Sequence, residues 1–275
     1  MSCGSGSKAG TNLPERLDTA LASRGQARSR THAAKLIAAG LVTIDGHPAV
    51  KPSAPVEANQ VIAVASSDHY VSRAAHKLIA ALDAFELDVT GRVALDAGAS
   101  TGGFTQVLLE RGARHVLAID VGHGQLAPEI RADASVSTVE GFNIRKLSRE
   151  FIEAQRAVPE PPTLVTADLS FISLRMVLPA MVESVGLDAD YVLLIKPQFE
   201  VGRTGIREGI VRDVGLRQDA VNSVLWAAWD IGLPTAGVIP SPIAGGAGNR
   251  EYLAWLSAAV GSNPTEWRLQ VSAMA

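Results

Sequence analysis

The first 64 residues place apolar positions in a pattern that predicts two short helices followed by a small sheet. We expect the first helix to run from Pro14 to Gly25, with Leu17 on its buried face, and the second to end at Gly40. Short apolar segments then predict strands at residues 41–44, 47–50 and 61–64, the first two joined by a tight Asp-Gly turn. This part of the chain is therefore predicted to be a small α+β domain.

From residue 72 onward, short apolar runs alternate with helical patterns, beginning with a helix that Ser72 would cap. Strands are expected at residues 93–96, 115–120, 136–140, 164–168, 191–196, 235–241 and 251–256, and the helices between them at 102–112, 124–132, 144–154, 173–185 and 213–231. Strand–helix alternation of this kind is typical of a doubly wound α/β sheet. We predict a Rossmann-like sheet of seven strands with helices on both faces.

Local composition suggests how the chain is divided. Residues 1–13 are rich in Gly and Ser and are expected to be disordered, and residues 65–71 are short, polar and typical of a linker. The predicted domains are therefore residues 14–64 and residues 72–275.

The bulk composition excludes several classes of protein. With 47% hydrophobic residues in 275, the chain can bury two cores, and its single cysteine, Cys3, allows no internal disulfide framework or zinc cluster. We therefore expect no metal site and a reducing, cytoplasmic compartment. The first residues lack the apolar segment of a signal peptide, and the longest uncharged span, residues 231–249, contains three prolines and five glycines. No membrane association is expected.

The charge is unevenly distributed along the chain. Residues 1–77 contain nine Lys/Arg and five Asp/Glu, whereas residues 78–275 contain sixteen and twenty-three. Arg28, His32 and Lys35 would share one face of the second helix. Such a basic face suits phosphate contacts, although an ordinary solvated surface has the same composition.

The run VALDAGASTGGFTQVLLERG, residues 93–112, joins an apolar strand to a helix through a glycine-rich turn. Glycines allow the backbone to turn sharply and approach a ligand, and the free N–H groups of the helix point at that ligand. Asp120 ends the next strand, where nucleotide-binding βαβ units place an acid that binds ribose hydroxyls. The spacing DxGxxxG from Asp96 to Gly102 favours S-adenosylmethionine over NAD. A turn that binds no nucleotide is the alternative.

Two later strands end in charged residues at the edge where ligands bind in such sheets. Asp168 follows the strand at 164–168, and Lys196 ends the strand at 191–196. A ribose 2′-hydroxyl is a poor nucleophile while protonated, and a lysine held away from water beside another cation can accept that proton near neutral pH. Each residue taken singly could equally be an ordinary surface side chain.

The front domain closely resembles S4-type RNA-binding domains. The similarity lies in RLD at residues 16–18, the Ser-Arg pair at Ser29 and Arg30, the AAKLI helix and the G-V-x-I-x-G hairpin, and spans residues 16–64. The resemblance implies binding of structured RNA. The phosphate contacts that it implies are Arg16, Arg28, Arg30, Lys35 and Lys51.

The remainder resembles the TlyA-type rRNA methyltransferases, a branch of the FtsJ-like 2′-O-ribose group that has also carried the name hemolysin. The motifs are VSRAAHKL, LDAGASTGGFT, ADLSFISL, LIKPQFEVG and GNREYLAWL, so that the resemblance covers about residues 14–256. The Lys-Asp-Lys-Glu tetrad of that family falls on Lys77, Asp168, Lys196 and Glu251. The resemblance implies that Lys196 is the base, helped by Asp168, and that Lys77 and Glu251 orient the ribose.

The same resemblance assigns the cofactor, S-adenosylmethionine, to the glycine turn and its neighbours. Asp96 would support the turn or receive the amino group of the cofactor, Asp120 would bind its ribose, Asn143 would face the adenine, and Phe171 would flank the methionine portion. The predicted cofactor residues are Asp96, Gly98, Ser100, Thr101, Gly102, Gly103, Asp120, Asn143 and Phe171.

The function expected from this resemblance is methylation of a ribose 2′-hydroxyl, on cytidine, in ribosomal RNA within ribosomal subunits. Residues 199–212 would form a mobile loop facing the RNA, or an ordinary surface loop. Two alternatives stay open: an RNA-binding protein with an inactive methyltransferase fold, and a membrane-lytic hemolysin.

Overall fold

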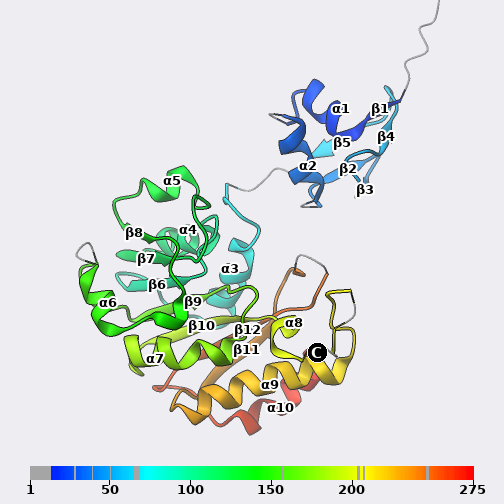
Figure 1. Cartoon of the computed structure of the whole chain (residues 1–275). Coiled ribbons are helices and arrows are strands. Elements are labelled where there is room, and N and C mark those ends of the chain that lie inside the picture. Colours follow the sequence, from blue (N-terminus) through cyan, green and yellow to red (C-terminus); the bar gives the residue numbers. More distant parts are fainter. Residues whose placement is uncertain are drawn as a thin grey trace, which may run out of the picture. The chain divides into compact units, whose positions relative to one another are not determined.

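The computed structural model describes residues 14–27, 29–38, 40–49, 51–64, 69–155, 158–202, 205–206, 208–245 and 248–275. The expected disorder of residues 1–13, most of the expected linker and the RNA contact assigned to Arg28 lie outside these residues. The chain divides into two compact units, and the division falls between His69 and Tyr70 (Figure 1). The domain limits given above remain predictions.

The first unit packs two helices against short strands. Its elements are β1 (Glu15–Arg16), α1 (Leu17–Ser23), α2 (Arg30–Ala38), β2 (Val42–Ile44), β3 (His47–Pro48), β4 (Pro55–Val56) and β5 (Ile62–Val64). Three of the strands form an antiparallel sheet in the order β3-β2-β5, and β1 pairs with β4. The buried apolar positions of both helices meet this sheet in one small core, which includes Leu17, Leu21 and Ile37.

The prediction that the first helix opens at Pro14 is wrong. Glu15 and Arg16 form a strand that pairs with Val56 and Pro55, and the helix begins at Leu17. A two-residue pairing leaves no periodic signal in the sequence. The chain therefore enters the unit through a sheet contact rather than through a capped helix.

The second unit contains a seven-stranded sheet in the order β11-β12-β10-β9-β6-β7-β8 (Figure 1). Strands β6, β7, β8, β9 and β10 are parallel, and β12 runs antiparallel to both β10 and β11. The strands are β6 (Val93–Ala97), β7 (His115–Ile119), β8 (Val136–Val139), β9 (Leu164–Ala167), β10 (Asp190–Ile195), β11 (Thr235–Pro240) and β12 (Tyr252–Leu256). The predicted Rossmann-like α/β sheet of seven strands is confirmed.

Helices cover both faces of this sheet. The helices and 3-10 turns are α3 (Ala75–Ala84), α4 (Gly103–Glu110), α5 (Pro128–Arg131), η1 (Ile144–Lys146), α6 (Arg149–Ala154), η2 (Leu174–Met176), α7 (Leu178–Val185), α8 (Pro197–Glu200), α9 (Val214–Asp230), η4 (Pro264–Trp267) and α10 (Arg268–Met274). Helices α3 and α4 pack in one apolar core, and α7 and α9 contribute to the core on the opposite face. Residues of β6 and β10 contribute to both cores, as expected for central strands.

Several predicted helices begin later or are divided. Ser72 caps a turn by accepting a hydrogen bond from Ala74 N, and α3 itself begins at Ala75. The expected helix at 173–185 is the turn η2 followed by α7, because Pro179 lacks the N–H that would continue the first segment. The expected helix at 144–154 is likewise η1 followed by α6, which Ser148 caps. Lys196 lies just beyond β10, at the start of α8, which periodicity did not predict.

Candidate active site

Two positions of the glycine turn between β6 and α4 have no room for a side chain. Gly98 has φ +83°, and a Cβ there would lie 2.7 Å from the carbonyl oxygen of Asp168. Gly102 has φ +97° and precedes the first residue of α4. The turn therefore lies directly against the segment that follows β9.

Asp96 supports the turn from within the sheet. Its side chain is fully buried, and its two carboxylate oxygens accept hydrogen bonds from Thr105 Oγ1 at 2.7 Å and from Thr166 Oγ1 at 3.1 Å. Burial raises the pKa of this carboxyl to about 6, and the two threonine hydrogen bonds oppose that rise. Of the two functions expected for Asp96, this geometry favours support of the turn.

Asp120 connects the turn to the end of β7. One carboxylate oxygen accepts a hydrogen bond from Ser100 N at 2.8 Å, and the other accepts from Gly122 N at 2.7 Å. Ser100 has a φ of +48°, which a non-glycine residue seldom adopts, and this contact holds it there. The sheet edge thus brings Asp120 beside the turn, as the sequence predicted.

Two cavities open along this edge of the sheet. The larger has a volume of about 450 Å³, within the range of small-molecule sites, and the smaller about 150 Å³. Of the predicted cofactor residues, Gly98 and Ser100 line both cavities, Asp120, Asn143 and Phe171 line the larger, and Thr101 and Gly103 line the smaller. Asp96 and Gly102 line neither cavity. Asp168 lines both cavities, and Lys196 lines the smaller.

Asp168 and Lys196 form one half of the predicted tetrad. Their strands, β9 and β10, are parallel neighbours, so that both residues emerge at the same edge. Lys196 Nζ lies 2.6 Å from Asp168 Oδ1 and donates a hydrogen bond to Ser170 Oγ at 2.9 Å. Because Asp168 Oδ1 accepts no well-directed hydrogen bond, its contact with the ammonium is an ion pair. Both side chains keep slight exposure, 16% and 10%, toward the cavity.

Lys77 and Glu251 form the other half. Lys77 lies on α3 and Glu251 immediately before β12, 174 residues apart, yet Lys77 Nζ lies 2.6 Å from Glu251 Oε2. The side chains are 9% and 2% exposed. Tyr252 pairs with Ile195 across β12 and β10, so Glu251 and Lys196 occupy adjacent ends of these two strands. The structure therefore gathers the four tetrad residues at one end of the sheet as two ion pairs.

Two of the predicted RNA contacts converge in the first unit. Asp18 Oδ2 forms ion pairs with Arg16 Nη2 at 3.0 Å and with Arg30 Nη2 at 3.2 Å, and the Asp18 side chain is only 8% exposed. The Arg16 guanidinium, helped by Arg30, holds the pKa of this carboxyl well below its usual range, and burial opposes that effect. Each arginine keeps more than half of its side chain exposed. Lys35 and Lys51 are exposed on α2 and on the loop before β4.

Sequence periodicity missed three polar residues that hold the site together: Ser170, which contacts Lys196, and Asn249 and Glu200. Asn249 accepts a hydrogen bond from Val211 N and donates one to Gly209 O. It thereby attaches the second half of the 199–212 loop to the segment that carries Glu251. The signal that could have found Ser170 and Asn249 is their position inside the ADLSF and GNREYL motifs.

Phe171 is unusual because a large apolar ring is 92% exposed on a residue with φ +65°. Its ring centroid lies 5.4 Å from that of Phe199. The predicted position beside the cofactor fits its place in the lining of the larger cavity.

Within the described ranges, no helix is long and apolar enough to cross a membrane. In the same part of the chain, no group of three or more His, Cys, Asp or Glu side chains is arranged to hold a metal ion.

Comparison with known proteins gives matches over most of the chain. The family model described as FtsJ-like methyltransferase matches residues 70–258, and the model described as S4 domain matches residues 15–62. The 16S/23S rRNA (cytidine-2'-O)-methyltransferase TlyA of Mycobacterium tuberculosis is 50% identical over 88% of this chain and 89% of its own length. Hemolysin A of Brachyspira hyodysenteriae is 38% identical over 87% of this chain and 98% of its own length. A solved structure from Streptococcus thermophilus whose name contains the word hemolysin superposes with a TM-score of 0.73, at 35% identity, over 95% of both chains.

Removing one partner of the buried Lys77–Glu251 pair should destabilise the second unit strongly. Lys77→Met leaves the Glu251 carboxylate buried without its cation, which costs about 3–5 kcal/mol of unfolding free energy. The double variant Lys77→Met/Glu251→Gln should recover most of that loss. Chemical denaturation measures both variants, and Asp83→Asn, which breaks the exposed pair with Arg111, is the control and should cost less than about 1 kcal/mol. A double variant no more stable than Lys77→Met would contradict the explanation.

Asp96→Asn should change how stability depends on pH. Because the pKa of Asp96 rises from 3.8 to about 6 on folding, the folded chain binds more protons than the unfolded chain between these values. Wild-type stability therefore falls as pH rises from about 4 to about 6, and the asparagine variant lacks this contribution. Between about pH 3.5 and about pH 7, the wild type should lose about 3 kcal/mol of unfolding free energy relative to the asparagine variant. Urea unfolding at a series of pH values measures it, and a difference independent of pH would show that the explanation is wrong.

Proposed function

Because the chain belongs to the family of FtsJ-like methyltransferases, we propose that it transfers a methyl group from S-adenosylmethionine to a ribose 2′-hydroxyl of ribosomal RNA. The membership confirms the resemblance that the motifs indicated, and the S4 match confirms the one for the front domain. The observation that carries the proposal is the position of Asp168. It lines both cavities and lies 2.6 Å from Lys196 Nζ.

The glycine turn and its surroundings fit S-adenosylmethionine. Backbone without a Cβ at Gly98 borders both cavities, and Asp120 at the end of β7 suits the ribose hydroxyls. Asn143 and Phe171 line the same larger cavity, where they would contact the adenine and the methionine portion. When bound, the cofactor supplies an electrophilic methyl group.

Lys196 is the proposed base for the 2′-hydroxyl. Asp168 and Ser170 fix its Nζ at the rim of the smaller cavity. Once the ammonium has lost a proton to solvent, the neutral amine can accept the hydroxyl proton from a substrate placed there. Asp168 then stabilises the ammonium that forms. The neighbouring Lys77–Glu251 pair adds a fixed charge network that would orient the ribose.

The proposed substrate is a cytidine of ribosomal RNA within a ribosomal subunit, in the cytoplasm. Support comes from the S4 match and from relatives that are named for cytidine-2'-O-methylation of ribosomal RNA. Arg16 and Arg30, held side by side by Asp18, would contact phosphates together with Arg28, Lys35 and Lys51. The two intact Lys–carboxylate pairs argue against an inactive fold.

The name hemolysin on some relatives supplies the competing function. Release of a fluorescent dye from liposomes by the purified chain tests it directly. We expect no release above background at concentrations that give full methyl transfer.

Two substitutions of Lys196 separate a base from a simple positive charge. Lys196→Ala and Lys196→Arg should both lower methyl transfer to ribosomal subunits by about 10²–10⁴-fold, because neither side chain accepts a proton near neutral pH. Calorimetric titration should give S-adenosylmethionine affinities within about threefold of wild type for both variants, because Lys196 is not among the residues proposed to hold the cofactor and does not line the larger cavity. Transfer by Lys196→Arg at the wild-type rate would eliminate the base assignment. Mapping of methylated riboses on the product RNA identifies the nucleotide.

Arg30→Gln should weaken RNA binding in a salt-dependent manner. If Arg30 contacts one phosphate, the slope of log affinity against log salt should decrease by about one unit. The control is Arg114→Gln, which removes the same charge beside the start of β7, at the edge of the sheet opposite the cavities. Filter binding of ribosomal RNA at several salt concentrations measures both, and equal slopes for the two variants would contradict the assignment.

A further inference from the structure

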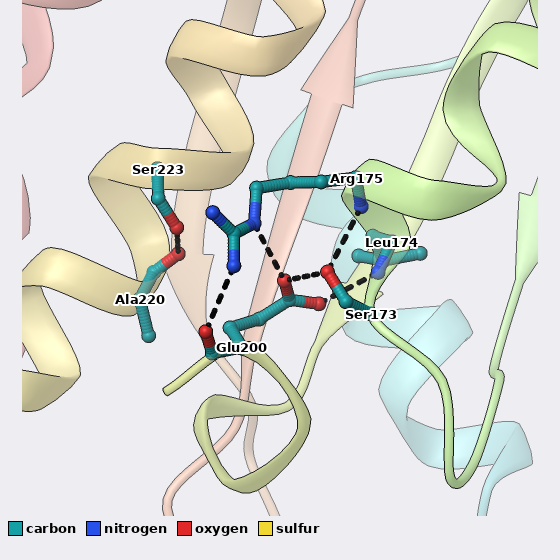
Figure 2. A network of polar contacts seen from close by, with 6 residues as sticks. All are labelled: Ser173, Leu174, Arg175, Glu200, Ala220 and Ser223. Carbon is teal, nitrogen blue, oxygen red and sulfur yellow. Dashed lines mark hydrogen bonds and ion pairs between the residues drawn. The ribbon is translucent and has the colours of Figure 1, made fainter. Parts of the chain in front are cut away.

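A buried carboxylate outside the tetrad connects the two segments that carry Asp168 and Lys196. Glu200 is the last residue of α8, and its side chain is only 1% exposed. It accepts hydrogen bonds from Leu174 N at 2.7 Å and from Ser173 Oγ at 2.5 Å (Figure 2). A carboxylate buried to this degree is costly unless its oxygens are satisfied, so these contacts define where it can lie.

Arg175 completes the network from the other side. Its Nε lies 3.4 Å from the Glu200 carboxylate, and its Nη2 donates to the Glu200 carbonyl oxygen at 3.0 Å (Figure 2). Ser173 Oγ, which donates to Glu200, also accepts a hydrogen bond from Arg175 N. The start of η2 is therefore fastened to the end of α8 by side chain and backbone together.

The segment between β9 and η2 has few other attachments. Asp168 N donates to Ala97 O at its beginning, and among the described residues no backbone–backbone hydrogen bond involves residues 169–172. Ser170, in the middle, meets the Lys196 ammonium. Leu169 and Ile172 pack against the apolar core, and the Phe171 ring contacts Phe199. The hydrogen bonds that fix the backbone of this segment at its two ends are therefore those to the sheet and to Glu200.

The short helix α8 links Glu200 to the proposed base, Lys196. Lys196 immediately precedes α8, and its carbonyl oxygen accepts a hydrogen bond from Phe199 N. Glu200 is four residues beyond Lys196, about one helical turn. The two segments therefore contact each other at two places. Lys196 meets Asp168 and Ser170 at one, and Glu200 meets Ser173 at the other.

We infer that Glu200 is a positioning residue for methyl transfer: it fixes residues 168–173 against α8 and so sets Asp168 and Ser170 relative to Lys196. It contacts neither of the two cavities and acts only through the residues that it holds. The inference rests on the proposed function, because it assigns Glu200 to the same reaction. Removal of the Glu200 carboxylate should therefore lower the rate of methyl transfer and leave the binding of S-adenosylmethionine and of ribosomal subunits nearly unchanged.

Kinetics of Glu200→Ala and Glu200→Gln test the inference. A misplacement of catalytic groups by about 1 Å can cost about 10²-fold, so Glu200→Ala should lower kcat by about that factor. Glu200→Gln should keep at least about a tenth of wild-type kcat, because its amide can still accept from Leu174 N and donate to Ser173 Oγ. The KM for ribosomal subunits and the Kd for S-adenosylmethionine should stay within about threefold of wild type.

Ser223→Ala is the matched control, because this nearby hydroxyl donates only to Ala220 O of its own helix α9 (Figure 2). It should leave kcat unchanged. The inference is overturned if folded Glu200→Ala keeps kcat within about threefold of wild type, or if its loss lies in KM and Kd. Should Glu200→Ala not fold, Glu200→Asp decides: its shorter side chain withdraws the carboxylate from Leu174 N and Ser173 Oγ, so a kcat within about threefold of wild type there overturns the inference. An inactive wild-type chain would instead overturn the proposed function.

Discussion

The close approach of the glycine turn to the end of β9 is the constraint on which the site depends. A Cβ at Gly98 would lie 2.7 Å from Asp168 O, so the backbone of the glycine turn directly contacts the residue that pairs with Lys196. Parallel pairing of β9 with both β6 and β10 then brings the turn, Asp168 and Lys196 to the same edge of the sheet. The glycine turn, Asp168 and Lys196 are neighbours because three adjacent strands end together.

The tetrad shows how buried charge can specify geometry at a cost in stability. Two lysines and two carboxylates, none more than 16% exposed on its side chain, form two ion pairs. Pairs of this kind add little net stability, because desolvation offsets their attraction. Their value here is that each holds an ammonium group in one place, and Lys77 with Glu251 also joins α3 to the end of β12.

The sequence predicted the parts that depend on local pattern. The central strands show as apolar runs because they are buried on both faces, and Asp168 and Lys196 could be placed because they follow such strands. Lys77 and Glu251 could not be found in this way, since no periodicity links side chains 174 residues apart, and only motif resemblance indicated them. Glu200 and the β1–β4 pairing left no periodic signal, because each depends on contacts between distant segments.

The uneven charge has a physical meaning once both units are described. Residues 78–275 carry twenty-three acidic against sixteen basic side chains, so this part of the chain should repel rather than attract phosphates at long range. In the first unit, Asp18 neutralises only part of the charge of Arg16 and Arg30 and leaves both guanidinium groups more than half exposed. A carboxylate that aligns two arginines reduces the entropy that they lose on meeting an RNA backbone. The basic residues that could attract an RNA backbone are thus concentrated in the first unit, whereas the charge of the second unit is predominantly acidic.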